Sequence, residues 1–385
     1  MGEQGGFPRG QVGQSKSPAQ SGDSRISLKD IANELGISQT AVSFAVNDKP
    51  GVSQETKRRV RDVATRMGWS PAYAAQALGT SRTMTVGFAP ARSMDAFQTE
   101  NFMLHFMAGI HASLSRLGYG LLFRPCATLA EELETYRDWA RRKRVDGVIL
   151  VDLLADDPRP RLIHDLGLPA VLAGGPDSDN YLPSLSIDDT KTMTTIMRHL
   201  SSLGHSRIAY LSGDGNLDYS RARASSFEAF VRKEGLGAPA VEFTDFDPDR
   251  AAGLTYRLSS GPEPYTAFIY ENEILAAASL RFLLARGMGL PGCGTKARPQ
   301  PPGGQALSQN RSTGLPAMVS FEDSFICQST YPTITSVHRD AGLYGTKVAN
   351  LLLKIFRGGE VSGNRRILTP KLVIRESTSL VGIPG

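Results

Sequence analysis

Two short segments near the N-terminus carry residue types and spacings that suit recognition of DNA. Apolar side chains recur at helical intervals over residues 28–35 and again over 37–46, and Gly36 separates the two runs. Ser27 and Ser38 precede the runs, where each hydroxyl can accept a hydrogen bond from a backbone N–H at the start of a helix. Two such helices form either a helix-turn-helix, whose second helix enters the major groove, or a plain helical hairpin.

The charge of this region favours the DNA-binding alternative. The chain has a net charge of +5 and an isoelectric point of about 9.1. Residues 24–70 contain eight basic and five acidic residues, so this short region holds most of the excess. Ser53 can cap a third helix whose apolar residues face inward and whose basic cluster, 57–61, faces outward, and the three-helix unit ends at Trp69.

Enzyme chemistry has little support in the chain. The nucleophile motif GxSxG and the metalloprotease motif HExxH are absent, and the six histidines are scattered. The glycines of 212–215 follow an expected strand, as in a dinucleotide-binding turn, but Asp218 stands where the third glycine would be and would repel a pyrophosphate. Cys126, Cys293 and Cys327 are far apart and lack metal-ligand spacing. We therefore expect no enzyme activity, no cofactor, no metal and no disulfide framework.

Composition divides the N-terminal part of the chain into an arm, a helical headpiece and a linker. Residues 1–24 are rich in Gly, Gln, Ser and Pro, lack an apolar segment of signal-peptide length, and are expected to be a disordered arm. The headpiece covers 25–70. Residues 71–83 are either a plain linker or a hinge helix that forms only against DNA or its symmetry mate, with Leu78 as an apolar wedge. No apolar run is long enough to span a membrane, so we expect a cytoplasmic protein without a membrane partner.

The core, residues 84–385, alternates short β-rich runs with helical runs. Its strands are continuously apolar, which predicts an α/β fold with parallel sheets covered on both faces. The units are too many for one sheet, so we expect two lobes with a ligand-binding cleft between the carboxyl ends of their strands. Residues 292–316 are rich in Gly, Pro and Gln and are expected to be a disordered insertion. Helices are expected at 101–117, 130–143, 158–166, 190–203, 219–234, 249–259, 272–286 and 340–357.

Several segments resemble the lac-repressor (LacI/GalR) family of transcription factors. The headpiece and hinge of that family are matched by LKDIANELGISQTAVSFAVN, VSQETKRRVRDVATRMGWSP and AAQAL. Core segments follow in family order, among them RVDGVILV, HLSSLGHSRIAYLSG, VSFEDS and ITSVHRDAGLYGTKVANLLL, so the resemblance runs from Ser27 to the end apart from the insertion. It implies a homodimer that reads a palindromic operator, and a core like that of periplasmic binding proteins that binds a small effector, often a sugar or a nucleoside.

The resemblance also implies a mechanism. Repression is the default function, and an effector would control operator affinity by shifting the population between two arrangements of the lobes. A solute-binding protein for transport shares this core but has no need of residues 27–70, whereas a DNA-binding protein whose core only dimerises stays open. The apolar faces of 101–117 and 272–286 are candidate dimer contacts, unless they only pack on their own sheets. The chain lacks a C-terminal heptad helix, so we expect a dimer rather than a tetramer.

The DNA-contacting residues follow from the resemblance by position. Gln39 and Thr40 open the recognition helix and would face base edges, since a glutamine amide can bond adenine or guanine. The other positions that match DNA contacts of the family are Leu28, Ser38, Ser43, Phe44, Asn47, Ser53, Thr56, Ala75 and Leu78. Phe44 replaces a common arginine, so it would contact a thymine methyl group or pack beside Trp69. Ala72 replaces the usual hinge asparagine.

Four residues match effector-binding positions of the family. Arg223 would hold ligand hydroxyls or a carboxylate, or else serve as a structural ion-pair partner. Asn272 and Glu322 would bond sugar hydroxyls, and Phe102 could stack on a ring. Two features depart from the family pattern: Glu322 replaces the usual aspartate, and an acidic–basic pair is replaced by two glycines at 174–175.

Overall fold

The chain divides into two units, Met1–Ser81 and Arg82–Gly385. A computed structural model describes residues 26–69, 82–92, 101–289, 314–368 and 370–379. The expectations for the arm 1–24, for the linker residues 71–81 with Ala75 and Leu78, and for most of the insertion lie outside the described residues.

Three helices build the first unit around a small apolar core. They are α1 (Leu28–Leu35), α2 (Gln39–Val46) and α3 (Gln54–Arg66). All three helices contribute to the buried cluster of Ile31, Ala32, Val42, Ala45, Val60 and Ala64. Gly36 ends α1 with a left-handed φ of 66°, which permits the tight turn into α2. The predicted three-helix headpiece is therefore confirmed.

Serine residues stand at the start of each headpiece helix, as the sequence predicts. Ser38 and Ser53 each accept a hydrogen bond from the backbone N–H three residues later, at 3.1 Å. At Ser27 the side-chain bond runs the other way, because its hydroxyl donates to the Asp30 carboxylate at 2.7 Å. The same carboxylate accepts from the Ser27 backbone N–H at 2.8 Å. The residue that precedes α1 is therefore still hydrogen-bonded to the first turn of the helix.

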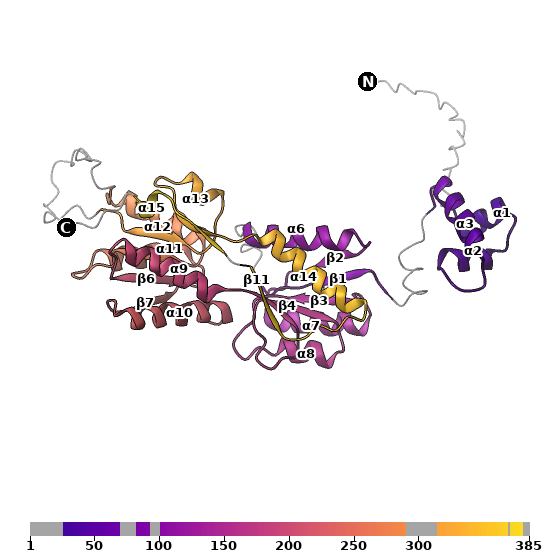
Figure 1. The fold of residues 1–385 in the computed structure, drawn as a ribbon, viewed down its shortest axis with the longest axis horizontal. Coiled ribbons are helices and arrows are strands. Elements are labelled where there is room, and N and C mark those ends of the chain that lie inside the picture. The colour runs from indigo at the N-terminus through magenta and orange to yellow at the C-terminus, as the bar shows by residue number, and fades with distance from the viewer. Residues whose placement is uncertain (1–25, 70–81, 93–100, 290–313, 369, 380–385) are drawn as a thin grey trace, which may run out of the picture. The chain divides into compact units, whose positions relative to one another are not determined.

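The second unit contains two six-stranded sheets that define two lobes (Figure 1). The first lobe has the strand order β11-β5-β4-β3-β1-β2 and the second has β12-β10-β9-β8-β6-β7. The first lobe comprises β1 (Thr85–Phe88), α6 (Asn101–Ser115), β2 (Gly120–Phe123), α7 (Leu129–Arg141), β3 (Gly147–Leu150), α8 (Arg159–Asp165), β4 (Ala170–Ala173), β5 (Ser184–Ile187), α14 (Ala341–Phe356) and β11 (Asn364–Leu368). The second comprises α9 (Asp189–Ser202), β6 (Ile208–Ser212), α10 (Asp218–Glu234), β7 (Ala240–Phe243), α11 (Pro248–Ser259), β8 (Ala267–Tyr270), α12 (Glu273–Ala285), β9 (Ala317–Ser320), α13 (Phe325–Ser329), β10 (Thr335–His338), β12 (Lys371–Val373) and α15 (Glu376–Ser379).

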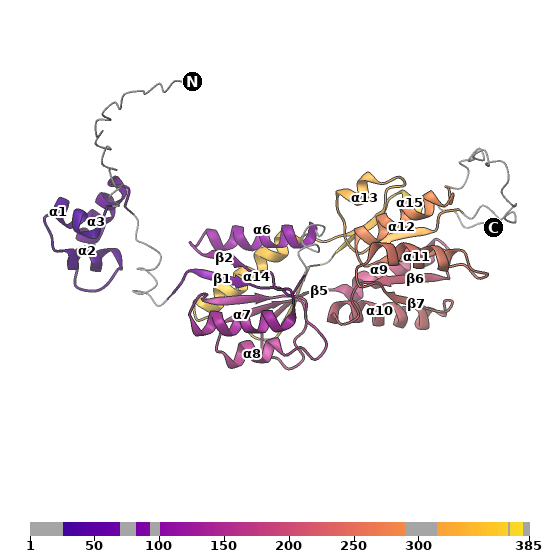
Figure 2. The ribbon, with the colours of Figure 1, turned by 180° about the vertical axis from the view of Figure 1, so that it is seen from behind.

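Each sheet is covered by helices on both faces, which explains its continuously apolar strands. In the first lobe, α6 and α14 lie on one face, and α7 and α8 lie on the other, as Figure 2 shows from behind. Along β3, Ile149 packs toward α6 and α14, whereas Val148 and Leu150 pack toward α7 and α8. The second lobe repeats this arrangement, with α9 and α10 on one face and α11 and α12 on the other.

The C-terminal strands depart from the predicted pattern. The run ILTPKLVIRES, residues 367–377, is one β-rich segment in the sequence, but it supplies the end of β11 in the first sheet and the whole of β12 in the second. All strand pairs are parallel except β12 with β10, which is antiparallel. The sequence pattern gave no separate signal for β5 or for the short helices α13 and α15. The chain therefore crosses between the lobes after β5, after β10 and after β11.

Helices α6 and α14 cross in direct backbone contact. A Cβ added to Gly109 of α6 would lie 2.0 Å from the carbonyl oxygen of Gly342 in α14. A Cβ added to Gly345 would lie 2.1 Å from the carbonyl oxygen of Phe106. Only glycine fits at these two positions without moving a helix. The crossing fixes α6 and α14 against each other as one body.

Candidate DNA-binding and effector sites

The start of α2 presents polar side chains opposite a buried face. Gln39 and Thr40 are exposed in its first turn, whereas Val42 and Ala45 are buried against the other helices. Ser38 and Ser53 are also exposed, and the other predicted contact residues in the described headpiece are half-buried: Leu28, Ser43, Phe44, Asn47 and Thr56. This arrangement suits a helix that enters a groove by its N-terminal end.

One member of the basic cluster does not face outward. Lys57 is 5% exposed, and its ammonium group donates to the Asp48 carboxylate at 2.8 Å. Arg61 lies 3.6 Å from the same carboxylate. The hydrogen bond from Lys57, together with its charge, lowers the pKa of Asp48. The prediction was therefore wrong for Lys57, which ties the turn after α2 to α3.

Phe44 lies against the turn that follows α2. A Cβ at Gly51 would be 3.6 Å from its ring, and the Lys49 ammonium group lies 5.9 Å from the ring centroid. Trp69 packs on the apolar core of the three helices. The ring of Phe44 therefore lies against residues of the turn between α2 and α3.

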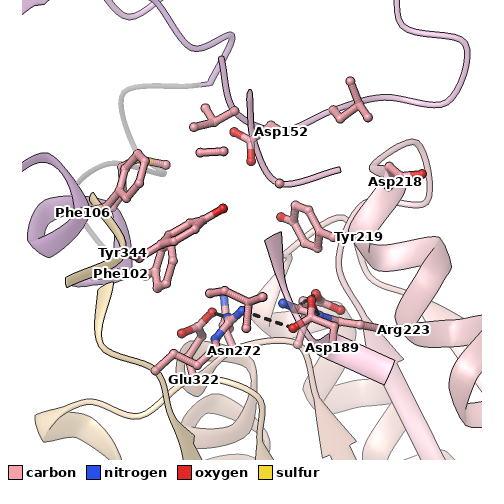
Figure 3. Close-up of a pocket in the computed structure, with 18 of the residues that line it drawn as sticks. Phe102, Phe106, Asp152, Asp189, Asp218, Tyr219, Arg223, Asn272, Glu322 and Tyr344 are labelled. Carbon is pink, nitrogen blue, oxygen red and sulfur yellow. Dashed lines mark hydrogen bonds and ion pairs between the residues drawn. The ribbon is translucent and has the colours of Figure 1, made fainter. Parts of the chain in front are cut away.

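A cavity of about 140 Å³ lies between the two lobes, at the carboxyl ends of their strands (Figure 3). The four predicted effector residues all line it: Phe102, Arg223, Asn272 and Glu322. Phe102 comes from α6 of the first lobe, and the other three come from the second lobe. The glycines at 174 and 175 also line it. The four predicted effector residues, which are far apart in the sequence, thus line one cavity, and this cavity lies between the lobes as predicted.

Arg223 is held by two carboxylates on the floor of the cavity. It is 4% exposed, its Nε donates to Asp189 at 2.7 Å, and its Nη1 donates to Glu271. Glu271 also accepts from the hydroxyls of Tyr210 and Ser212. Burial alone would lower the pKa of the guanidinium, but the charges of Asp189 and Glu271 raise it above its ordinary value. Arg223 therefore both lines the cavity and serves as a structural ion-pair partner.

A second buried arginine, Arg339, was missed by the sequence analysis. Its side chain is 5% exposed, forms an ion pair with Glu322, and lies 3.7 Å from an oxygen of Asp189. Its guanidinium stands 5.0 Å from the centroid of the Phe102 ring. Burial, and then repulsion from Arg223, lowers the pKa of Arg339 to about 10. It lies directly after β10, where the chain crosses between the lobes.

The remaining predicted residues are fixed by their own neighbours. The Asn272 side-chain oxygen accepts from the Leu275 backbone N–H at 3.0 Å and caps α12. Asn272 also lines the cavity, and its amide nitrogen can only donate hydrogen bonds. Phe102 stacks at 6.3 Å on Phe106, and Tyr344 of α14 lies beside both rings. The α6–α14 crossing therefore positions the aromatic side of the cavity.

A backbone bridge joins the lobes at the rim of the cavity. Leu154 of the first lobe pairs with Leu217 of the second in an isolated antiparallel bridge. The Asp218 N–H donates to the Leu153 carbonyl at 2.8 Å, and the Ala155 N–H donates to the Asn216 carbonyl at 3.1 Å. Arg92 and Asp152 form an ion pair beside it. The loop after β3 thus contacts the start of α10 directly.

Other sequence features have structural explanations. A Cβ at Gly213 would lie 2.3 Å from the ring of Phe246, so this glycine is needed for packing. Cys126 and Cys327 are buried free thiols. Among the described residues, no cluster of His, Cys, Asp or Glu could hold a metal ion. Within the same ranges, no helix has the length and apolarity needed to cross a membrane.

A helix-turn-helix headpiece joined to this two-lobed core defines the chain as a DNA-binding transcriptional regulator. Residues 27–72 match the model of bacterial regulatory proteins of the lacI family. Residues 93–375 match the model of periplasmic binding proteins and the sugar binding domain of the LacI family. These matches cover most of the chain, which therefore belongs to the LacI family.

Individual relatives agree with this assignment. The HTH-type transcriptional regulator CelR of Thermobifida fusca is 25% identical over 357 residues, which cover 92% of this chain and 98% of the relative. A structure of a CelR–cellobiose complex has a TM-score of 0.65 at 24% identity and covers 92% of this chain and 100% of its own. The lac repressor dimer bound to operator and anti-inducer has a TM-score of 0.73 at 20% identity, over 92% and 99% of the two chains. These relatives are regulators rather than enzymes.

Proposed function

We propose that this chain is a homodimeric repressor that binds a palindromic operator and changes its affinity when a small sugar occupies the interlobe cavity. The observation that carries the proposal is the presence, in one chain, of an exposed recognition-helix start and an interlobe cavity whose wall includes buried charged residues. CelR, a relative along nearly the whole chain, has been solved with cellobiose, which supports a sugar as effector. A repressor acts where the chromosome is, so the proposal includes a cytoplasmic location.

In the proposed complex, the first turn of α2 reads the bases. Gln39 and Thr40 are exposed there and would contact base edges in the major groove. Phosphates would be held by short hydroxyl and amide groups at Ser38, Ser43, Asn47, Ser53 and Thr56, with Leu28 and Phe44 adding apolar contacts. Ala75 and Leu78 would enter the minor groove at the centre of the palindrome, where Leu78 separates a base step.

The proposed dimer would use apolar side chains that the second unit leaves exposed. The inner faces of α6 and α12 pack on their own sheets, yet each helix also carries an exposed leucine, Leu104 and Leu284. Further exposed apolar residues are Phe325, which is 79% exposed, Tyr331 and Leu343. Large exposed apolar groups favour an interface with a second copy.

The proposed control is a shift between two populations. The effector cavity lies between the lobes, so a ligand can bind one arrangement of the lobes more tightly than the other. Such a ligand shifts the population toward the arrangement that it binds more tightly, by an amount set by the difference between the two affinities. By linkage, operator binding changes effector affinity by the same factor. The rim bridge between Leu154 and Leu217 is a contact that depends on the arrangement of the lobes.

Selection from a random DNA library with the purified full-length protein tests the DNA-binding part. We expect a palindrome whose binding is weakened by Leu78→Ala and by Gln39→Ala, while an exposed control, Arg232→Ala on α10, leaves it unchanged. Recovery of no enriched sequence, with only steeply salt-dependent binding in the presence and absence of a sugar panel, would contradict the proposal.

Thermal-shift and operator-release assays test the effector part. A sugar that raises the unfolding temperature and changes operator affinity supports the proposal. If no sugar does either, while the operator is bound normally, the core only dimerises.

A further inference from the structure

Exposed basic residues gather at one edge of the first lobe. In a parallel sheet all strands start at the same edge, and the helices that connect them end there. Strands β3, β1 and β2 are neighbours in this sheet. The segments that precede these strands, together with the end of α14, contain exposed cations that form a basic rim: Arg82, Arg116, Arg141, Arg142, Lys143, Arg144, Lys354 and Arg357.

Contacts between these segments hold the rim together. The Nη2 of Arg82 donates to the carbonyl oxygen of Phe356, the last residue of α14, at 2.8 Å. The Phe356 ring stacks on Tyr119, in the connection before β2, with the ring centroids 5.3 Å apart. The Asp146 carboxylate, in the connection before β3, accepts from the Thr83 backbone N–H at 2.6 Å. The end of α14 and the start of β1 thus lie at one edge (Figure 1).

Carboxylates neutralise only a small part of the rim. Arg141 and Arg142 share the carboxylate of Asp138, at 3.0 and 2.7 Å. The other six rim cations form no ion pair with any residue in the described ranges. The rim therefore presents a positive potential to the solvent.

The second lobe shows that the fold itself does not require these charges. Its strand order is the same, so β6, β7 and β8 correspond to β1, β2 and β3. The connection before β2 contains Arg116, whereas residues 235–239, before β7, contain no charged residue. Residues 142–146, before β3, contain three basic residues and one acidic residue, whereas residues 260–266, before β8, contain only Glu263 as a charged residue. The basic excess therefore belongs to the lobe from which the chain leads to the headpiece.

One rim residue occupies a backbone position that favours glycine. Lys143 stands two residues after the end of α7 and has a φ of 49°. At the same position after α8, α9, α12 and α14 the chain has glycine, with φ between 63° and 88°: Gly167, Gly204, Gly287 and Gly358. A residue with a Cβ is disfavoured in this left-handed conformation, so lysine costs stability here. That cost is offset if the ammonium group binds an anion.

We propose that the basic rim binds DNA phosphates, so that the core adds a sequence-independent contact to the base contacts of the headpiece. Duplex DNA carries one negative charge per roughly 1.7 Å of its axis, which complements a row of unpaired cations. The match of residues 27–72 to the DNA-binding region of the lacI family identifies this polyanion as one that the chain meets.

The length of the linker supports DNA as the partner. Residues 70–81 join the headpiece to Arg82 in the rim, and twelve residues span at most about 40 Å when fully extended. DNA held by the headpiece therefore has a high local concentration at the rim. The DNA contacts proposed above all lie within residues 28–78, so the rim goes beyond them, and it depends on neither an effector nor repression.

Salt-dependent DNA binding by the full-length protein tests the rim. The triple variant Arg142→Gln, Lys143→Gln, Arg144→Gln removes three rim charges. If each charge contacts one phosphate, the slope of log K against log salt concentration becomes shallower by about 2–3, and the affinity near 0.15 M salt falls roughly 10- to 100-fold. The loss should be the same on the selected operator and on DNA of unrelated sequence, because phosphates carry no sequence information.

A matched variant controls for net charge. Arg232→Gln, Lys233→Gln, Arg257→Gln removes three charges from exposed positions of the second lobe. Its net charge equals that of the rim variant, so a general electrostatic effect would weaken DNA binding equally in both. We expect the control to keep the wild-type slope.

A single substitution separates the loss of a phosphate contact from the loss of structure. Lys143→Gly removes one rim charge and places glycine in the left-handed position. We expect a slope that is shallower by about 1, together with an unfolding temperature equal to or above that of the wild type. A misfolded variant would instead lower the unfolding temperature.

Lysine acetylation measures the contact on the unmodified protein. Lys143 lies in the rim, and Lys233 is an exposed lysine of the second lobe. Reaction with an acetyl ester, followed by peptide mass spectrometry, gives the rate at each lysine with and without DNA. DNA should slow the acetylation of Lys143 severalfold and leave that of Lys233 unchanged.

The outcomes separate the rim from the proposed function. An unchanged slope in the rim variant, an equal loss in the matched control, or an acetylation rate at Lys143 that DNA does not alter refutes the rim. A loss confined to the operator also refutes it, because phosphate contacts do not depend on sequence. If no operator is selected but DNA binding still depends on the rim, the proposed operator recognition fails and the rim stands. If the wild type binds no DNA, both fail.

Discussion

Replacing Gly109 by alanine tests the backbone contact between α6 and α14. The new Cβ would lie 2.0 Å from the Gly342 carbonyl oxygen, so the helices must separate by roughly 1 Å to restore van der Waals contact. Overpacking of this kind costs about 1–3 kcal/mol of unfolding free energy. Because the obstacle is backbone rather than a flexible side chain, no rotamer change can relieve it.

A second glycine supplies the matched control. Gly253 lies in the middle of α11, is exposed, and has no atom within 4 Å of an added Cβ. There, alanine gains helix propensity without a clash and should stabilise the second unit by about 0.5–1 kcal/mol. The two substitutions are chemically identical, so their expected difference of about 1.5–4 kcal/mol isolates the helix crossing.

Urea unfolding followed by circular dichroism measures both variants against the wild type. Gly109→Ala should lower the transition midpoint and Gly253→Ala should raise it, with unchanged slopes. Because Phe102 and Tyr344 lie on the crossing helices, Gly109→Ala should also weaken effector binding. Equal midpoints for the two variants, or a higher midpoint for Gly109→Ala, would refute the reasoning.

Three further predictions concern the headpiece and the thiols. Ser53→Ala should destabilise the headpiece by about 1 kcal/mol through the loss of its cap, measured by amide hydrogen exchange of α3; unchanged exchange would contradict it. Lys57 lowers the pKa of Asp48, so this pair contributes stability above pH 3.8 that is lost as the pH falls below that value. Asp48→Asn should remove the contribution of this pair to the pH dependence of amide hydrogen exchange in α3. An unchanged pH dependence in the variant would contradict the prediction. Burial raises the pKa of Cys126, and that of Cys327 to about 11, so iodoacetamide at pH 7.5 should label both thiols far more slowly in native protein than in urea, as peptide mass spectrometry would reveal. Equal labelling rates in the two states would contradict their burial.

The helices were predictable because each has a strong local signal. The apolar period and the serine caps placed α1, α2 and α3, and the eight expected core helices lie within a few residues of their observed bounds. β5 was missed, and so was the division of the C-terminal run between β11 and β12, because strand identity depends on the partner that the strand meets. The chain at 364–373 contributes to two sheets, and no periodicity within ten residues encodes such a change of partner.

The cavity was predictable in part. Phe102, Arg223, Asn272 and Glu322 line one cavity, although their binding roles stay predictions. Arg339 was missed because its neighbours come from distant parts of the chain, and one arginine after a strand carries no pattern of its own. The signal that was available is its position in HRD, directly after an apolar strand, since polar residues at strand ends gather around clefts. Lys57 was assigned to the surface because charge alone does not reveal a partner such as Asp48.

The three crossings between the lobes affect the synthesis of the chain. When β5 leaves the ribosome, the first lobe still lacks α14, which covers the apolar face of α6, and β11, which pairs with β5. Nearly the whole second lobe is translated before these parts arrive, a delay on the order of ten seconds at typical elongation rates. The second lobe in turn waits for β12 and α15. A message truncated before α14 would therefore yield a chain in which the headpiece is complete and neither lobe is.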